Sequence, residues 1–312
     1  MSDDIYEVLI IGAGCAGLAA GMYSGRFGMK TAIIGELPGG TITLTDVVEN
    51  YPGIVSTTGQ GLADMLLAHA KAYDVPIIQE KAEKISKGAD GSFTVKTDGG
   101  SYSSKSIIYA TGTEWKKLNV PGEKEFANKG VHYCALCDGA FYKNKIMVVA
   151  GSGDSAAKES LLLSGLGSHV YLLVRGDALH GEPINNKRVA ENRKITVLTN
   201  TQILEVKGDK KVTHLKLNRK VKPFDGGEET DLLPTNSLFV EIGHVAKSEL
   251  AKELGVALNK KGEIIIDREA KTNIPGFFAA GDVVDTVFKQ AITGASEGVT
   301  ASYSAYQYLG KE

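Results

Sequence analysis

One short pattern occurs twice in this chain and limits the folds that it can adopt. Its first copy has an apolar run at residues 6–11, a glycine-rich loop at residues 12–17, a run of good helix formers and a second apolar run at residues 31–34. This order predicts a strand, a helix and a second, parallel strand, and it makes the G-x-G-x-x-G spacing a strong dinucleotide signature. The loop residues expected to contact the dinucleotide are Gly12, Gly14, Ala16 and Gly17.

The second copy lies 139 residues further along the chain, where Gly151 takes the place of Gly12. By the same offset Glu36, just after the second strand of the first copy, corresponds to Arg175. An acidic residue at this position suits a free ribose diol, while a basic residue suits a 2′-phosphate. The two copies therefore predict different dinucleotides, the second of them NADPH. The contacts expected from the second copy are Gly151, Gly153, Asp154, Ser155, Ala156 and Arg175.

Between the two copies stands a C-x-x-C motif, Cys134 and Cys137, followed directly by Asp138. Such a pair can close into a disulfide or open to two thiols, and a thiol of lowered pKa attacks disulfides. The alternatives are a zinc site and two inert cysteines. Structural zinc needs about four N or S ligands, and only His132 stands nearby; the third cysteine, Cys15, lies in the first glycine loop. A redox dithiol is the favoured interpretation.

Composition limits the class of protein. A length of 312 residues suits about two domains. With 35 basic and 37 acidic residues the net charge is −2, so we expect neither nucleic acid nor an anionic membrane as a partner. No apolar run approaches the roughly 20 residues of a membrane span. An acidic N-terminus and three cysteines are not typical of a secreted protein, so we expect a cytoplasmic one.

The rest of the chain shows further strand and helix patterns. We expect a helix at residues 61–73, a long C-terminal helix at residues 290–309, and strands near residues 77–85, 92–97, 101–109, 195–198, 203–206, 212–217 and 237–243. Asp282 follows Ala279–Gly281 at a turn after a strand. Its carboxylate is suited either to a polyhydroxyl chain, such as the ribityl group of a flavin, or to capping the turn.

Together these segments resemble the low-molecular-weight thioredoxin reductase family, and the match runs through nearly the whole chain. The motifs occur in the family's order and spacing, and as a set they are highly specific. They are Gly12–Gly17, Gly39–Gly40, Glu49–Gly53, Ala110–Gly112, Cys134–Gly139, Gly151–Ala156, and Ala279–Asp282 with Lys289–Ala291.

The resemblance implies an α/β fold of two Rossmann-like nucleotide-binding domains, each with three ββα layers, the second inserted into the first. Residues 1–116 and 245–312 would form an FAD-binding domain. Residues 117–244 would form a pyridine-nucleotide-type domain that carries the Cys134–Cys137 disulfide. A homodimer and a rotation of the domains about the two crossovers are also implied.

The resemblance further implies roles for single residues. Asp138 would handle the proton during dithiol–disulfide exchange. Besides the first glycine loop and Glu36, the residues expected to bind FAD are Gly39, Gly40, Thr41, Asn50, Thr111, Gly112, Gly281, Asp282, Lys289, Gln290 and Ala291.

The sequence departs from the family pattern at two places. Thr41 stands where the family usually has Gln. NADPH-using members also read the 2′-phosphate with an H-R-R-x-x-x-R run, and here only Arg175 remains, because Gly176 and His180 replace two cations and Asp177 adds a negative charge. Each charge-assisted contact contributes roughly 1.5–3 kcal/mol, so NADPH binding should be weaker by several orders of magnitude. Relatives with an eroded run use NADH, ferredoxin or a deazaflavin, and the electron donor stays open.

The sequence thus predicts a flavoenzyme in which FAD passes two electrons to the Cys134–Cys137 disulfide, which then reduces thioredoxin or a glutaredoxin-like protein. Cys137 would face the flavin, and Cys134 would attack the substrate. One alternative is a hydroperoxide-reductase flavoprotein, which normally carries an N-terminal disulfide extension that we do not expect in this chain. Another is a flavin electron carrier without disulfide turnover.

Overall fold

The computed structural model describes residues 5–311 and divides into two compact units. Unit 1 extends to Glu114 and resumes at Val245, and unit 2 spans Trp115–His244. The chain therefore crosses between units after Glu114 and again after His244. The two crossover segments, β7 (Thr113–Trp115) and β16 (His244–Ala246), pair with each other as a two-stranded sheet.

Unit 1 is built on a seven-stranded sheet. Five of its strands form a parallel core, because β1 pairs with β2 and β6, β2 pairs with β3, and β17 pairs with β6. The last two strands, β4 and β5, continue from β6 as an antiparallel meander. The strands are β1 (Tyr6–Ile11), β2 (Thr31–Ile34), β3 (Ile77–Ile78), β4 (Ala82–Lys87), β5 (Phe93–Thr97), β6 (Ser101–Tyr109) and β17 (Phe277–Ala279).

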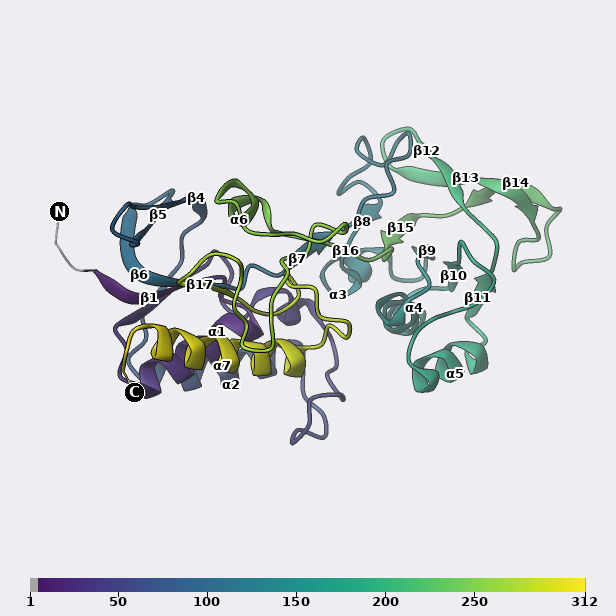
Figure 1. The fold of residues 1–312 in the computed structure, drawn as a ribbon. Helices are drawn as coiled ribbons and strands as arrows, with labels where there is room; N and C mark the ends of the chain where they lie inside the picture. Colours follow the sequence, from purple (N-terminus) through teal and green to yellow (C-terminus); the bar gives the residue numbers. More distant parts are fainter. Residues whose placement is uncertain (1–4, 312) are drawn as a thin grey trace. The chain divides into compact units, whose positions relative to one another are not determined.

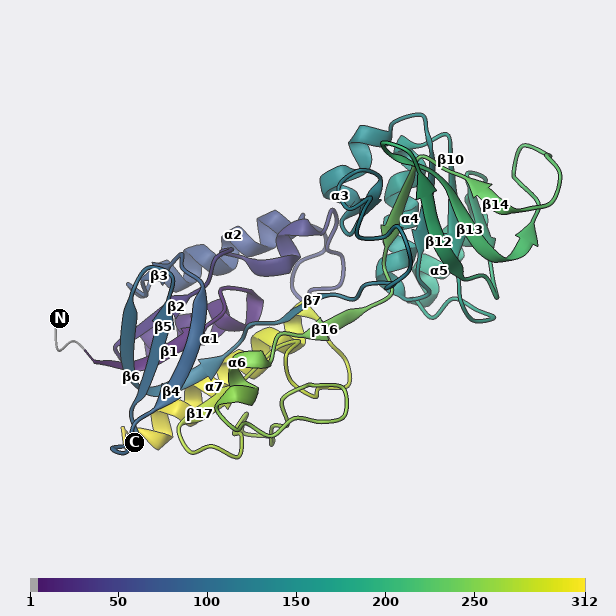
Figure 2. The same cartoon turned by 90° about the horizontal axis from the view of Figure 1, so that it is seen from above.

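Apolar side chains pack on both faces of this sheet and stabilise it. Residues 8–11 of β1 are all buried, as a strand covered on both sides requires. Helices α1 (Cys15–Arg26), α2 (Gly59–Lys71) and α7 (Ala291–Tyr308) lie on one face of the sheet (Figures 1 and 2). The helices α1 and α7 pack closely, since a Cβ at Gly298 would lie 2.2 Å from the Ala16 carbonyl oxygen.

Unit 2 repeats this plan with a five-stranded parallel sheet in the order β11-β10-β9-β15-β8 (Figure 1). Helices pack on one face, and a three-stranded antiparallel sheet covers the other. The predicted fold of two Rossmann-like ββα units is confirmed. The elements are β8 (Val131–His132), β9 (Ile146–Ala150), β10 (His169–Leu173), β11 (Ile195–Leu198), β15 (Ser237–Val240), α3 (Ala135–Asp138), α4 (Asp154–Leu166) and α5 (Pro183–Glu191), with β12 (Ile203–Gly208), β13 (Val212–Val221) and β14 (Thr230–Pro234) in the antiparallel sheet.

Some element predictions were wrong or incomplete. The strand expected at residues 77–85 is two strands, because β3 runs parallel to β2 whereas β4 pairs antiparallel with β5. The sequence did not predict α5, which has few apolar residues, although Pro183 stands at its start, where proline is favoured. Short elements were also missed, namely the crossover strands, β8, β14, α3, α6 (Glu249–Glu253) and the 3-10 turns Gly40–Leu44 and Gly139–Tyr142. Within residues 5–311, none of the helices has the length and apolar character needed to cross a membrane.

Candidate active site

The first glycine loop of unit 1 is shaped by close backbone contacts. Gly12 has φ +116°, and a Cβ there would lie 2.1 Å from the Ala110 carbonyl oxygen. A Cβ at Gly17 would lie 1.9 Å from the Gly12 carbonyl oxygen. At Gly14, by contrast, the nearest atoms to a Cβ are 3.9 Å away. Gly12 and Gly17 are therefore needed by the fold itself, while Gly14 leaves open space where a ligand can approach.

The helix that follows this loop starts without a side-chain cap. Gly14 caps α1 without a side-chain hydrogen bond, and no acidic residue stands in the first turn. Such a helix start favours an anion, because its first N–H groups have no intrahelical partner. The Gly39 N–H donates to the Ala13 carbonyl oxygen at 2.8 Å, and a Cβ at Gly40 would meet the Gly14 Cα at 2.8 Å. The paired glycines thus border the loop.

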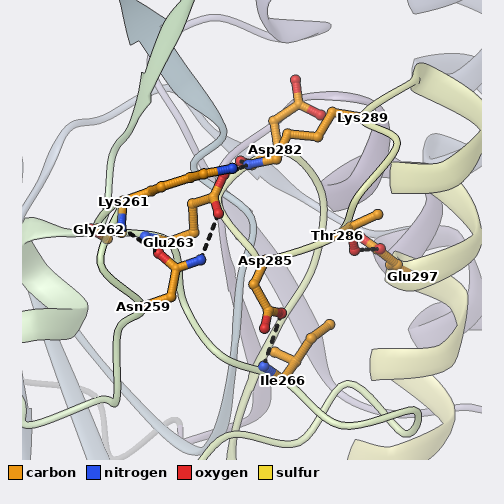
Figure 3. Close-up of polar contacts among 11 residues, drawn as sticks. Asn259, Lys261, Gly262, Glu263, Ile266, Asp282, Asp285, Thr286, Lys289 and Glu297 are labelled. Carbon is orange, nitrogen blue, oxygen red and sulfur yellow. Dashed lines mark hydrogen bonds and ion pairs between the residues drawn. The ribbon is translucent and has the colours of Figure 1, made fainter.

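Asp282 lies beside the same helix start. The preceding Gly281 is so close to α1 that a Cβ on it would lie 2.9 Å from the Ala16 Cβ. Burial raises the pKa of the Cys15 thiol to about 11, and the nearby Asp282 carboxylate contributes to this shift. The Gly281 N–H donates to Glu297 Oε2 at 2.8 Å, and Glu297 also binds the Thr286 hydroxyl (Figure 3). Glu297 therefore fixes the turn that presents Asp282.

Residues 289–291 lead into α7 next to the turn that carries Asp282. The Lys289 ammonium is 2.5 Å from Glu263 Oε1 and 2.8 Å from the Asp282 carbonyl oxygen (Figure 3). The Asn50 amide donates to Gln290 Oε1 at 3.1 Å, although the two residues are 240 positions apart. The fold therefore brings together side chains that the sequence predicted only as separate members of one site.

The other residues predicted for this site lie at loops next to it. Glu36 and Thr41 are exposed. The Thr111 hydroxyl donates to the Lys247 carbonyl oxygen at 2.7 Å, and Gly112 has φ +68°. Ala291 is the first residue of α7. The sequence analysis missed Glu297 and Glu263, because no local motif links these carboxylates to the turn that they support.

These residues fit FAD. The loop at residues 12–17 is a cradle that side chains would fill, α1 begins at it without a side-chain cap or an acidic residue, and a carboxylate suited to a hydroxyl-rich chain stands beside it.

In unit 2, Cys134 and Cys137 are joined by a disulfide, with their Cα atoms 5.4 Å apart. Cys134 caps the short helix α3, and its Sγ accepts a hydrogen bond from the Cys137 N–H at 3.2 Å. Cys134 is 7% exposed, while Cys137 is exposed. The C-x-x-C motif thus forms a compact turn with its second sulfur-bearing residue at the surface.

Asp138 is held by a neighbouring histidine. Its Oδ2 lies 3.0 Å from His132 Nδ1, and His132 Nε2 is 2.9 Å from the Tyr142 hydroxyl. The His132 ring is buried and stacks on Phe239, with ring centroids 5.4 Å apart. Burial, followed by the charge of Asp138, raises the pKa of Tyr142. The sequence analysis considered His132 only as a metal ligand and missed this contact.

The second glycine loop is shaped by the same kind of close backbone contact as the first. A Cβ at Gly151 would lie 2.1 Å from the Glu241 carbonyl oxygen, whereas a Cβ at Gly153 would meet nothing within 4 Å. Ser155 is exposed and Ala156 is buried. The loop is therefore intact and open at its second glycine.

The carboxylate of Asp154, the first residue of α4, binds groups within unit 2. Its Oδ1 accepts hydrogen bonds from the Glu182 N–H at 2.8 Å and the Asn185 amide at 2.9 Å, and its Oδ2 is 3.0 Å from the Lys158 ammonium. Burial acts to raise the pKa of Asp154, but these partners together lower it. Asp154 thus fixes the segment that follows β10.

That segment carries one cation next to the loop. Arg175 and His180 are exposed, as is Asp177 between them. The His180 N–H donates to the Ser152 carbonyl oxygen at 2.6 Å, so the segment folds back on the second glycine loop. Within residues 5–311, no group of three or more His, Cys, Asp or Glu side chains is arranged to hold a metal ion.

Comparison with known proteins gives the family. The model of the pyridine nucleotide-disulphide oxidoreductase family matches residues 6–298. The chain belongs to this family. A thioredoxin reductase of Listeria innocua is 37% identical over 309 residues, which are 98% of this chain and 95% of that protein. The crystal structure of Lactococcus lactis thioredoxin reductase matches with a TM-score of 0.91 at 35% identity, covering 98% of this chain and 100% of that one.

A second group of relatives is longer. A component of the alkyl hydroperoxide reductase of Escherichia coli is 38% identical over 311 residues, which are 98% of this chain but 58% of that protein. The identity is as high as for the first group, so the shared part alone does not separate the two. The family model and the thioredoxin reductases show that the chain is a disulfide-reducing flavoenzyme of the thioredoxin reductase type, and the predicted oxidoreductase class and FAD cofactor are confirmed.

Proposed function

We propose that this chain reduces the disulfide of thioredoxin or of a similar small protein through its Cys134–Cys137 pair. The observation that carries the proposal is the closed C-x-x-C disulfide, with Cys137 exposed and Asp138, whose carboxylate lies 3.0 Å from His132, directly after it. A dithiol at an accessible turn beside a proton-handling carboxylate is what disulfide exchange needs.

In this proposal unit 1 is the FAD-binding unit. The loop at residues 12–17 and the start of α1 hold the phosphates, Glu36 binds ribose hydroxyls, and Asp282 binds the ribityl chain. Residues 39–41, 111–112 and 289–291 with Asn50 complete the site. Bound FAD supplies two-electron chemistry that amino-acid side chains lack.

Unit 2 carries the electrons onward. Reduction breaks the bond between Cys134 and Cys137, consumes two electrons and two protons, and leaves two thiols, with Asp138 holding or delivering a proton at Cys137. The Cys134 thiolate then attacks the partner's disulfide, and Cys137 resolves the mixed disulfide, so the partner leaves as a dithiol. Because Cys134 is 7% exposed, this attack requires the turn to become accessible, and a rotation about β7 and β16 is the proposed movement.

The donor follows from the segment after β10. We expect NADPH to be a poor donor, because Arg175 is the one cation left of three and Asp177 repels a 2′-phosphate. NADH needs no such contact, and neither does a reduced ferredoxin or deazaflavin. Anaerobic mixing with each of the four donors, followed by flavin bleaching, ranks them.

We also propose a homodimer in the cytoplasm. The dimer rests on the family resemblance and the compartment on the acidic N-terminus and the small number of cysteines, and a reducing compartment agrees with a dithiol that must be regenerated. Light scattering on the purified protein measures the oligomeric state.

The test of the function is Cys137→Ser. This variant should keep its bound flavin, lose thioredoxin reduction with every donor, and accumulate a stable mixed disulfide between Cys134 and thioredoxin, because the resolving thiol is gone. Ala140→Ser, an exposed change two residues after Asp138, is the matched control and should reduce thioredoxin normally.

Two outcomes would contradict the proposal. Normal thioredoxin reduction by Cys137→Ser would remove the pair from turnover and leave a flavin electron carrier. If the wild-type protein reduces the peroxidase partner of an alkyl hydroperoxide reductase but not thioredoxin, the longer relatives give the better assignment.

A further inference from the structure

Glu159 of α4 contacts the turn that carries the redox cysteines. Its Oε1 accepts a hydrogen bond from the Ala135 N–H at 3.1 Å. Ala135 follows Cys134 directly, and the Cys137 N–H donates to Cys134 Sγ. In this turn the Ala135 N–H therefore donates to a carboxyl group, and the Cys137 N–H donates to a sulfur atom.

Glu159 is paired with a second buried carboxyl group, that of Glu241 at the end of β15. The charge of Glu159 raises the pKa of Glu241, so the two carboxyl groups lie close together. Glu159 Oε2 and Glu241 Oε1 are buried and have no hydrogen-bond partner within residues 5–311. Two buried carboxyl groups so close together do not both ionise near neutral pH, so one of them keeps its proton.

The two members of the pair differ in environment. Burial raises the pKa of both carboxyl groups; the Ala135 N–H opposes this at Glu159, while the charge of Glu159 raises the pKa of Glu241 further. Glu241 therefore holds the proton, and Glu159 is the first to ionise. The negative charge of the pair then lies on the member that touches the cysteine turn.

The backbone of Glu241 keeps the pair in place. Its N–H donates to the Ala150 carbonyl oxygen at 2.7 Å, and its own carbonyl oxygen packs against Gly151. Glu241 thus belongs to the wall of the second glycine loop, and its side chain reaches toward the cysteine turn through Glu159. Neither carboxyl group can move into water without disturbing one of these two segments.

We propose that Glu159, through its contact with the cysteine turn, is a positioning residue that sets how readily the Cys134–Cys137 disulfide is reduced. Reduction adds two electrons and two protons to the S–S bond, and ionisation of either thiol leaves a thiolate in the turn. A neighbouring carboxylate disfavours that thiolate. The proposal rests on the proposed function in taking this pair as the redox dithiol.

The experiment measures the dithiol–disulfide equilibrium of the flavin-loaded protein. The protein is equilibrated without oxygen in mixtures of reduced and oxidised dithiothreitol and quenched with an alkylating reagent, and peptide masses give the reduced fraction of Cys134 and Cys137. Glu159→Gln keeps an oxygen for the Ala135 N–H but cannot ionise. It should shift the equilibrium toward the dithiol by about threefold to tenfold, where tenfold corresponds to about 30 mV.

Two further variants separate charge from structure. Glu241→Gln removes the protonated carboxyl group and keeps the negative charge on Glu159, so it should leave the equilibrium close to that of the wild type. Glu191→Gln, the same change at an exposed site on α5 where the side chain is 67% exposed, should leave the equilibrium unchanged. Flavin absorbance and circular dichroism check that each variant is folded.

An equilibrium constant for Glu159→Gln equal to that of the wild type would overturn the proposal. If Glu159→Gln does not fold, the double variant Glu159→Gln with Glu241→Gln decides, and an equilibrium constant equal to that of the wild type would overturn the proposal. This measurement needs neither an electron donor nor thioredoxin, so it remains readable if the proposed protein substrate is wrong.

Discussion

The two glycine loops have nearly the same backbone and different surroundings. Gly14 and Gly153 cap their helices with φ/ψ of −81°/−172° and −85°/−176°, and neither makes a side-chain cap. A Cβ at Gly12 and one at Gly151 would each lie 2.1 Å from a carbonyl oxygen of a neighbouring strand end. Yet α1 has no acidic residue in its first turn, whereas α4 begins with Asp154.

This difference separates the residues that form each loop from the residues that are expected to select its ligand. The strand–loop–helix geometry is fixed by backbone contacts that admit only glycine, so it recurs wherever the glycines recur. In the proposed function the ligand is selected by side chains outside the loop, Glu36 and Asp282 in unit 1 and residues 175–180 in unit 2. A repeated fold motif therefore predicts the fold of both units but not the same ligand for both.

The strongest test of this comparison replaces the open glycine of each loop. Gly14→Val and Gly153→Val are matched, because both backbones accept a side chain without strain. Gly14→Val should weaken FAD binding by at least about 100-fold, roughly 2.7 kcal/mol, since the side chain fills the space kept for phosphate. Gly153→Val should retain FAD, and the one activity that it should lose is reduction of the flavin by pyridine nucleotides. Flavin content and flavin titration of the two proteins measure this.

Equal flavin loss in both variants would contradict the division of roles between the loops. Unchanged bleaching by NADH in Gly153→Val would show instead that the second loop binds no donor.

A second prediction restores the missing cations of unit 2. A Cβ at Gly176 would meet no atom within 4 Å, and His180 is exposed, so Gly176→Arg with His180→Arg can be accommodated. Two added charge-assisted contacts of roughly 1.5–3 kcal/mol each should lower the KM for NADPH by at least about tenfold and leave that for NADH nearly unchanged. The double variant Gly176→Gln with His180→Gln controls for side-chain bulk. An equal gain in that control would rule out a charge effect.

The smallest effect concerns Asp154. Its lowered pKa means that its ionised form stabilises unit 2 above the carboxyl pKa of the unfolded chain, about 3.9, and that this contribution is lost as the pH falls through the folded pKa. Asp154→Asn should therefore lower the free energy of unfolding by about 1 kcal/mol near neutral pH, with the difference shrinking in acid. Denaturant unfolding at several pH values measures it.

Asp177→Asn, at an exposed position in the same unit, is the matched control for this change. A stability difference for Asp154→Asn that stays constant from neutral pH into acid would show that its partners do not stabilise the charge.

The sequence predicted those parts of the fold and site that depend on local patterns. Both glycine loops, the C-x-x-C turn and the long helix α7 could be read from spacing and periodicity, because each is specified by residues close together in the chain. Asp282 was found through the small residues before it. Such features need no knowledge of the tertiary fold.

The supporting contacts could not be predicted, because they join distant positions. Glu297 reaches Gly281 across 16 residues, and Glu159 reaches Ala135 across 24. Glu241 stands in an apolar strand pattern where sequence alone gives no reason for a carboxyl group. Partners for such buried groups appear only when the strands and helices are packed.

The most direct test of the proposed function measures how many electrons the protein takes up per flavin. Anaerobic titration with dithionite, followed by flavin absorbance, should take up about four electrons per flavin in the wild-type protein, two for the cofactor and two for the disulfide. Cys137→Ser should take up about two. A wild-type protein that takes up only two, with Cys134 and Cys137 still joined, would contradict the claim that electrons leave this flavoenzyme through its C-x-x-C pair.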